Sequence, residues 1–414
     1  MTVHVVGAGL AGLAAATALS ERGTYVRVWE ASAQAGGRCR SYFDAQLGLT
    51  IDNGNHLVLS GNAAVRAYLR RLGAEDRLAG PPDARFPFVD LSSGERWSIR
   101  PNAGPIPWWI LKRDRGVPGA GLLDYLRLAG LFTGSGGRVD EAADCRGPVW
   151  ERLMHPFLLA ALNLEPGDGA AALAARVCRE TLGRGGGACA PRIAAPSLAA
   201  AFVDPALAYL ESRGAEIDLQ RRLTAMDLTA GRVAALRFGD AATPLGPGDE
   251  VVLAVPPWVA ADLVPGLTVP DAFESIVNGH FRIAPPAGAP LISGVLGATV
   301  QWIFCFEDRV SVTVSAANHL VNASRETLAR RLWEETAQAL GLAAALPPWQ
   351  IVKEKRATFE ASPAQEARRP GPNTAWANLI LAGDWTDTGL PATIEGAIRS
   401  GFRAADLIRH GKPS

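Results

Sequence analysis

The first thirty residues alternate between short apolar runs and turns. "VHVVGAGLAGLAAATALSERGTYVRVWE" (residues 3–30) has a strand-like apolar run, a glycine turn, a run of small helix-forming residues and a second strand-like run. This order predicts a β-strand, an α-helix and another β-strand, the opening unit of an α/β fold.

Two later stretches have patterns that complete such a fold. Residues 223–238, "LTAMDLTAGRVAALRF", predict two strands around Gly231, and "DEVVLAVPPWVAADL" (249–263) predicts a buried strand that ends at Pro256 and Pro257. In "LAGDWTDTGLPATIEGAIRSG" (381–401), a short apolar run meets Gly383 and Asp384, and a polar loop then leads to a helix that we expect to begin at Pro391.

One uncharged stretch, residues 283–306, is long enough to cross a membrane. Prolines and glycines interrupt it, however, and Gln301 lies in its second half. Residues 299–316, "TVQWIFCFEDRVSVTVSA", instead predict a β-hairpin, because Val310, Val312 and Val314 alternate with polar residues.

Composition narrows the class of protein. The chain has 414 residues, of which 48% are hydrophobic, and its 41 Lys and Arg balance 41 Asp and Glu, so nothing favours nucleic acid as a partner. The five cysteines are scattered without a CxxC pair or a Cys/His cluster, which argues against a metal site or a disulfide framework. With no signal peptide in view, we expect a cytoplasmic protein.

The glycine turn carries the first candidate chemistry. Gly7, Gly9 and Gly12 form G-x-G-x-x-G, with Leu10 and Ala11 at the helix start, and Glu30 ends the second strand. This spacing is typical of dinucleotide binding: the glycines allow a tight turn and close approach to pyrophosphate, and the acid accepts hydrogen bonds from ribose. The motif alone leaves NAD and FAD open.

Gly36, Gly37 and Arg38 directly after the second strand favour FAD, since a second glycine turn with an arginine suits another phosphate face. The C-terminal stretch fits the rest of an extended FAD. Asp384 would accept from ribityl hydroxyls, and the following helix start would place N–H groups at the flavin N1–C2=O edge. The cofactor contacts expected there are Gly383, Asp384, Thr393 and Ile394, with Leu223 on the adenine side.

We expect this FAD to be non-covalent, because no histidine or cysteine stands beside the C-terminal motif. The three fragments predict a discontinuous FAD-binding domain of residues 1–80, 205–265 and 350–414. Residues 81–204 and 266–349 would form a substrate domain. No second G-x-G-x-x-G follows a strand, so the electrons would come from an external donor.

With these motifs the chain resembles the monoamine oxidase and phytoene desaturase superfamily. "IDNGNHLVLSGN", "FESIVNGHFRI" and "LAGDWTDTGLPATIEGAIRSGFRAADLI" are similar to hydroxysqualene dehydroxylases. The resemblance implies an α/β, Rossmann-like FAD-binding domain of the amine-oxidase type with a discontinuous α+β substrate domain. It also implies reductive conversion of hydroxysqualene to squalene, by hydride from the reduced flavin N5 with loss of water. The glycine-rich segments 134–137 and 183–187 match no role in that family.

The loop after the short strand "LTID" holds candidate catalytic residues. In the superfamily this loop lies near the flavin, so Asn53, Gly54 and Asn55 are expected cofactor contacts. His56, or Asp52 if burial raised its pKa, would protonate the leaving hydroxyl. The alternative is that this loop has no catalytic residue and only forms hydrogen bonds to the flavin or to the backbone. His280 is a third candidate acid, with a buried structural histidine as the alternative.

Segment 104–132 is a candidate membrane contact. "PIPWWILKRDRG" places Trp108 and Trp109 before Lys112, Arg113 and Arg115, a combination that suits the surface of a bilayer on the cytoplasmic face of the inner membrane. The alternative is an ordinary core helix with a solvated end.

Three other functions share this fold. A carotenoid desaturase also takes a long polyene, whereas an amine oxidase typically has two tyrosines at the flavin, and this chain has no tyrosine after Tyr209. A binding protein like the GDP-dissociation inhibitors would lack the complete set of FAD motifs that this chain has.

Overall fold

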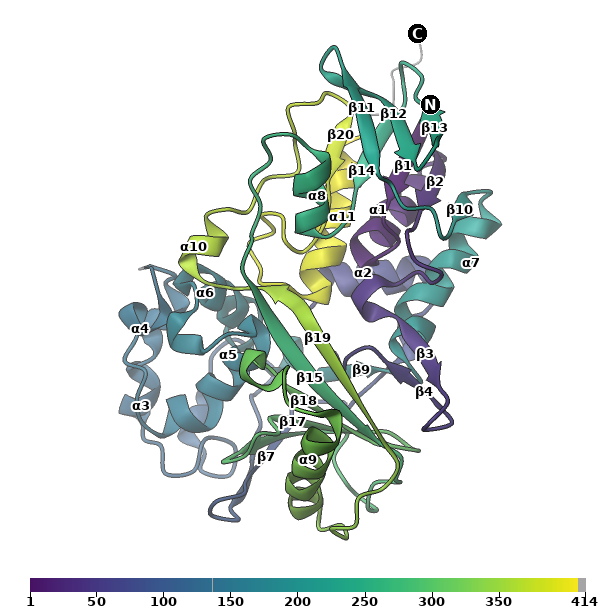
Figure 1. Cartoon of the computed structure of the whole chain (residues 1–414). Helices are drawn as coiled ribbons and strands as arrows, with labels where there is room; N and C mark the ends of the chain where they lie inside the picture. Colours follow the sequence, from purple (N-terminus) through teal and green to yellow (C-terminus); the bar gives the residue numbers. More distant parts are fainter. Residues whose placement is uncertain (136, 409–414) are drawn as a thin grey trace.

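The computed structural model describes residues 1–135 and 137–408. Figure 1 shows two sheets with helices around them and a separate helical region beside the second sheet. Gly136, in one of the two glycine-rich segments without an assigned role, lies outside the described residues.

The first sheet is a parallel sheet of five strands in the order β10-β2-β1-β14-β20. Its strands come from three distant parts of the chain: β1 (Thr2–Val6), β2 (Tyr25–Trp29), β10 (Glu216–Asp218), β14 (Glu250–Leu253) and β20 (Leu379–Leu381). The predicted strand–helix–strand unit is confirmed, with α1 (Leu10–Glu21) between β1 and β2. The hydrophobic pattern predicted this unit correctly because both strands are apolar and α1 is buried from Leu10 to Ser20.

Helix α11 (Ile394–Leu407) packs against α1 at close range (Figure 1). A Cβ on Gly401 would come within 2.1 Å of the Ala11 carbonyl oxygen, so the two backbones meet where a larger residue could not fit. Helix α2 (Ala63–Leu72) and helix α7 (Asp204–Ser212) flank this pair.

The predicted strand pair around Gly231 is also confirmed. Strands β11 (Ala225–Thr229) and β12 (Arg232–Phe238) are antiparallel, and β13 (Ala241–Pro244) adds a third strand. Ala230 and Gly231 both have positive φ angles, 50° and 74°, which matches the backbone that a two-residue hairpin turn needs. The buried strand β14 follows and ends before Pro256, as expected.

The second sheet has seven strands in the order β19-β15-β18-β17-β16-β7-β8. It is antiparallel apart from the β16/β7 pair. The strands are β7 (Phe86–Asp90), β8 (Arg96–Ile99), β15 (Phe273–Phe281), β16 (Ile292–Leu296), β17 (Trp302–Cys305), β18 (Val310–Val314) and β19 (Trp349–Phe359). The hairpin predicted in residues 299–316 is therefore confirmed as β17 and β18.

Helix α9 (Arg325–Leu340) covers one face of this sheet, and its Trp333 packs in one apolar cluster with Val310, Val312 and Val314. Ser311 and Thr313 point to the opposite face, because successive side chains of a strand alternate. Strand β19 belongs to this sheet although residues 350–359 fall in the stretch that we assign to the FAD-binding domain. The domain boundaries stay a prediction.

The remaining elements are short. Two small sheets contain β3 (Ser41–Asp44) with β4 (Leu49–Asp52), and β9 (Pro191–Ala194) between β5 (Leu57–Leu59) and β6 (Leu78–Ala79). The helices not yet named are α3 (Leu122–Leu126), α4 (Val139–Ala142), α5 (His155–Leu162), α6 (Ala171–Glu180), α8 (Pro257–Leu263) and α10 (Pro363–Glu366). Within residues 1–135 and 137–408, no helix combines the length and the apolar character that crossing a membrane requires.

Candidate active site

The glycine turn lies at the carboxyl end of β1, where parallel sheets bind their ligands. Gly7 has φ +105°, and a Cβ on Gly12 would lie 1.9 Å from the Gly7 carbonyl oxygen, so both positions need glycine for the turn itself. A Cβ on Gly9 would meet nothing within 4 Å. The space beside Gly9 is therefore open, as a phosphate in contact with the backbone requires.

The start of α1 leaves its donors free. Gly9 is the N-cap, no side chain caps the helix, and its first turn has no acidic residue. Among the described residues, the N–H groups of Leu10 and Ala11 therefore have no intrahelical or side-chain partner, and a helix end of this kind favours an anion.

Glu30 fixes the same turn from the end of β2. Its two carboxylate oxygens accept hydrogen bonds from the Ala8 and Ser32 amides, both at 2.8 Å. Each oxygen keeps a second lone pair for a ribose hydroxyl. The Arg221 amide donates to the Glu30 carbonyl at 2.7 Å. Leu223 follows two residues later, so the residue expected at the adenine lies near the residue expected at the ribose.

The second glycine turn touches the first. The Gly36 amide donates to the Ala8 carbonyl at 2.7 Å, and a Cβ on Gly37 would lie 3.4 Å from the Gly9 Cα. The structure thus brings both glycine motifs together in one cradle without side chains, and its residues fit a dinucleotide.

Arg38 and Asp384 are in direct contact, although we expected Arg38 at a phosphate and Asp384 at the ribityl chain. The guanidinium of Arg38 donates to both Asp384 oxygens, at 2.6 and 2.7 Å, and to the Ala357 carbonyl at 2.5 Å. Both bonds to Asp384 come from Nη2 of Arg38, and this ion pair links the N-terminal motif to the C-terminal one. Among the described residues the Nε of Arg38 has no hydrogen-bond partner, so it remains available to a ligand.

The C-terminal helix begins later than we expected. Helix α11 starts at Ile394, and Thr393 is its N-cap, with Oγ1 accepting from the Gly396 amide at 3.0 Å. The prediction that Pro391 opens the helix was wrong, because the threonine hydroxyl supplies the cap and Pro391 stays in the preceding loop. Gly383 has φ +153°, and a Cβ there would lie 2.3 Å from Nε1 of Trp385.

The loop that follows β4 lies against the second sheet. Asn53 donates to Glu354 of β19 at 3.0 Å, and the Asn55 amide side chain donates to Thr313 at 3.2 Å. Asn278 Oδ1 accepts from Thr313 at 2.8 Å, and a Cβ on Gly54 would lie 3.2 Å from Asn278 Nδ2. These contacts place residues 53–55 against β15, β18 and β19 of the second sheet.

Asp52 is buried at the end of β4. Its Oδ1 accepts from the Ser41 hydroxyl at 2.6 Å and from the Leu198 amide at 2.9 Å. Burial raises the pKa of this carboxyl, although the Ser41 and Leu198 hydrogen bonds oppose the rise. Within the described part of the chain, Oδ2 accepts no hydrogen bond.

The two candidate histidines are in environments that disfavour their charged form. Burial, with Arg38 nearby, lowers the pKa of His56 to about 4. Burial and Arg309 lower the pKa of His280 to about 3, and its Nδ1 lies 2.9 Å from the Ser311 hydroxyl. Nε2 of His280 is buried without a hydrogen-bond partner among the described residues. Both imidazoles are therefore neutral near pH 7.

A small apolar cavity of about 20 Å³ lies beside Leu59, in the strand that follows the loop of residues 53–56. Leu59 of β5 and Phe86, Phe88, Ile99 and Trp302 of the second sheet form part of its lining, and the rest comes from Leu153, Phe157, Leu182 and Cys189. No charged side chain lines it. The sequence did not reveal this cavity, because its walls come from segments scattered between residues 59 and 302.

Several contacts of the site have no local signal in the sequence. Glu354, Ser41 and Leu198 touch Asn53 or Asp52 only because the chain folds back on itself. The one available hint is the strand pattern of β15, which places Asn278 and His280 on the same face. The described residues contain no group of three or more His, Cys, Asp or Glu side chains arranged to hold a metal ion.

Comparisons with known proteins extend these observations. The family described as flavin containing amine oxidoreductase matches residues 10–409. The chain is 53% identical over 409 residues to hydroxysqualene dehydroxylase from Rhodopseudomonas palustris, covering 98% of each chain. It is 51% identical over 406 residues to hydroxysqualene dehydroxylase from Sinorhizobium fredii, covering 98% of this chain and 97% of the relative.

Among solved structures, cyclohexylamine oxidase from Brevibacterium oxydans has a similar fold, with a TM-score of 0.71 at 16% identity over 98% of each chain. That likeness shows the fold alone. The family match and the close relatives confirm an FAD cofactor and the expected α/β architecture. The chain therefore belongs to the flavin-containing amine oxidoreductase family and, within it, to the hydroxysqualene dehydroxylases.

Proposed function

We propose that this protein converts hydroxysqualene to squalene by replacing the hydroxyl group with hydrogen. The observation that carries this function is the near full-length identity to hydroxysqualene dehydroxylases, in a chain that keeps the FAD-binding glycines, Glu30 and Asp384 in place. Nothing in the site favours the desaturase or amine-oxidase alternative.

The residues that would hold FAD lie along one path. The uncapped start of α1 and the paired glycine turns take the pyrophosphate, and Glu30 takes the adenosine ribose. Arg38 and Asp384 take the polar middle of the cofactor, and the start of α11 at Thr393 and Ile394 faces the flavin end. When bound and reduced, FAD supplies the hydride that replaces the hydroxyl, and an external donor must reduce it again.

The chain itself must supply a proton to the leaving oxygen, so that water departs as the hydride arrives. Asp52 is the group we assign to this step. Its pKa is raised by burial, whereas the low pKa values of His56 and His280 leave little imidazolium to act as acid. The proton would be on Oδ2, the oxygen that accepts no hydrogen bond in the described residues.

Water must be kept from the allylic cation-like carbon that forms as the C–O bond breaks. The apolar cavity behind Leu59 suits this need, and we assign it to one end of the isoprenoid chain. At about 20 Å³ the cavity has room for about one water molecule, so it must widen to admit the larger isoprene unit.

A peripheral contact with the cytoplasmic face of the inner membrane is the finer proposal on location. Seven of the twelve exposed large apolar side chains in the described residues form what we call the apolar patch: Ile106, Trp108, Leu111, Leu122, Leu123, Leu126 and Phe132. Exposed Lys112, Arg113 and Arg127 lie along it, and basic residues beside apolar ones favour an anionic bilayer surface.

Trp109 does not belong to this surface. It is only 5% exposed and packs edge-on against Tyr125 with ring centroids 5.7 Å apart. The expectation that both tryptophans face a membrane was wrong for Trp109, because the 3₁₀ turn Trp108–Leu111 points it into the core, whereas Trp108 is 45% exposed.

The test of the function is a single-turnover conversion. Anaerobic, chemically reduced enzyme is incubated with hydroxysqualene, and the extracted lipids are analysed. We expect squalene in an amount equal to the enzyme-bound FAD. Unchanged hydroxysqualene with FAD still reduced would contradict the proposal.

A further inference from the structure

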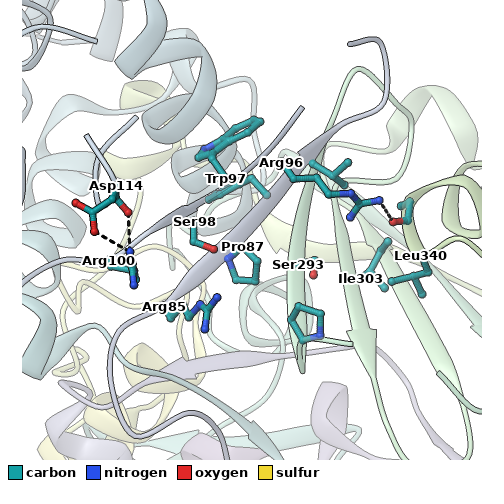
Figure 2. Close-up of a pocket in the computed structure, with 14 residues that line it drawn as sticks. Arg85, Pro87, Arg96, Trp97, Ser98, Arg100, Asp114, Ser293, Ile303 and Leu340 are labelled. Carbon is teal, nitrogen blue, oxygen red and sulfur yellow. Dashed lines mark hydrogen bonds and ion pairs between the residues drawn. The ribbon is translucent and has the colours of Figure 1, made fainter. Parts of the chain in front are cut away.

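A groove of about 420 Å³ opens beside β7 and β8, and of its lining residues only Phe88 also lines the apolar cavity described above. Its walls come from β7, β8, β16, β17 and the carboxyl-terminal end of α9, with Asp114 closing one end. Figure 2 shows Arg85, Pro87 and Ser98 near its centre, the pair of Arg100 and Asp114 on one side, and Arg96 reaching toward Leu340 on the other.

The groove takes its polar residues from one face of the sheet edge. Arg96, Ser98 and Arg100 are two residues apart along β8 and just beyond it, so their side chains project to the same side. Trp97 and Ile99, between them, are buried in the apolar cluster of the other face. The alternation thus places two guanidinium groups and a hydroxyl in a row.

The groove carries a surplus of positive charge. Arg85 is exposed and has no carboxylate partner within the described residues. In the described parts of the chain the guanidinium of Arg96 donates only to the Ala339 carbonyl, while Arg100 pairs with Asp114 at 3.0 Å. Asp114 is the single carboxylate that lines the groove, against three arginines, although the charges of the whole chain balance.

Hydrogen-bonding groups in the groove are also unused. The hydroxyls of Ser98 and Ser293 have no hydrogen-bond partner in the part of the chain that the structure describes, and both residues line the groove. Guanidinium groups that converge with hydroxyls match the several acceptor oxygens of a phosphate, which arginine binds in a fork.

We propose that this groove binds a phosphate group, either of a soluble phosphate ester or of a lipid headgroup. This binding site is separate from the FAD site, and the proposal does not depend on the proposed reaction. Arg85 and Arg96 supply the unpaired charge, and Ser98 and Ser293 supply neutral hydrogen bonds from the floor.

The experiment uses the FAD-loaded protein, so that the cofactor's own phosphate site is filled. Binding of glycerol 3-phosphate is followed by calorimetry. In a second arm, co-sedimentation is measured with vesicles of phosphatidylcholine alone and of phosphatidylcholine mixed with phosphatidylglycerol. The groove variant is Arg85→Gln with Arg96→Gln. The control, Arg66→Gln with Arg330→Gln, removes the same charge from exposed helix positions.

We expect the groove variant to bind the phosphate probe about tenfold more weakly or worse, as the loss of charge-assisted hydrogen bonds implies, while the control binds like the wild type. Loss of glycerol 3-phosphate binding would identify a soluble ligand. Loss confined to phosphatidylglycerol vesicles would identify a lipid headgroup. Equal binding by the two variants, or no binding of either probe by the wild type, would overturn the proposal.

Discussion

At the scale of single residues, burial acts in opposite directions on the candidate acids. It raises the pKa of the Asp52 carboxyl and lowers the pKa of the His56 and His280 imidazoles, because in each case the charged form loses its water. Near neutral pH all three side chains are thereby biased toward the uncharged state, and only the uncharged carboxyl still has an acidic proton to give.

Replacing Asp52 with asparagine tests its role as proton donor. Asparagine keeps an oxygen to accept from the Leu198 amide, so we expect the fold and the FAD content to persist. Turnover should fall by about 10²–10⁴-fold, the usual loss for a positioned acid. Single-turnover rates and the flavin-to-protein ratio are the measurements, and an unchanged rate would remove Asp52 from the mechanism.

The Ser41→Ala variant is a matched control for that experiment. In the wild type the Ser41 hydroxyl donates to Asp52 and lowers the pKa of that carboxyl. Removal of the hydroxyl should therefore raise the pKa of Asp52 further. A group that acts while protonated loses activity as pH rises through its pKa. The alkaline fall in rate should therefore move to higher pH in Ser41→Ala, and a shift to lower pH would contradict the assignment.

His280 makes stability depend on pH. Its pKa is about 3 in the folded protein, against the ordinary histidine value of 6.5, so the unfolded chain binds a proton that the folded chain excludes. This group's contribution to stability is fully present above pH 6.5 and is lost as pH falls toward 3. Between about pH 7.5 and about pH 5 the loss is about 2 kcal/mol.

We expect His280→Asn to remove that part of the pH dependence. Urea unfolding at both pH values, for the wild type and the variant, measures it. The free energy of unfolding should fall less in the variant than in the wild type. An equal fall in the two proteins would mean that His280 already carries its charge in the fold.

At the scale of elements, the glycine turns and helix ends form the site that we propose for the cofactor. Gly9 and Gly12 make a useful contrast, since a Cβ at Gly12 would collide with the Gly7 carbonyl whereas one at Gly9 would meet open space. The turn itself needs Gly12, and the ligand needs Gly9.

Gly9→Ala should therefore fold like the wild type but lose most of its FAD. Flavin released by acid precipitation and the thermal unfolding curve of the FAD-free protein are measured for Gly9→Ala, with Gly371→Ala as the control, because a Cβ on Gly371 also meets nothing within 4 Å and lies outside the glycine turns. The released flavin also tests the expectation of a non-covalent cofactor. Normal FAD content in Gly9→Ala would show that the phosphates bind elsewhere.

The sequence was most informative for elements whose pattern is local. The β1–α1–β2 unit and the β17/β18 hairpin could be predicted because strand alternation and glycine turns lie within a few residues of each other. Pro391 misled us, since proline also suits the loop before a cap, and Thr393 supplied that cap. The pairing of Arg38 with Asp384, 346 residues apart, has no local signal at all.

At the scale of the whole molecule, the site lies where the two sheets meet. Residues 53–55 contact Asn278 of β15 and Glu354 of β19, while the glycine turns lie at the end of the first sheet (Figure 1). Five of the seven residues of the apolar patch, by contrast, lie on α3 and the 3₁₀ turn Trp108–Leu111, which pack against each other. Because the apolar patch and the glycine turns lie on different elements, an apolar substrate could enter from a membrane while the cofactor faces water.

Trp108→Ser with Leu123→Ser tests the membrane contact. Leu123 is 70% exposed, so neither change removes core packing, and vesicle binding should weaken while FAD content stays constant. Phe43→Ser, also at an exposed position but outside the patch, is the control and should bind vesicles normally. Equal co-sedimentation of all three proteins would mean that the patch does not meet the bilayer.

The direction of the reaction is the central claim, and isotope transfer tests it most directly. Enzyme is reduced in deuterated buffer, so that the exchangeable hydrogen at flavin N5 becomes deuterium, and is then given unlabelled hydroxysqualene without oxygen. Squalene carrying one deuterium at the carbon that lost the hydroxyl is the predicted product. Squalene without deuterium, or oxidised FAD that becomes reduced when squalene is added, would contradict reductive dehydroxylation.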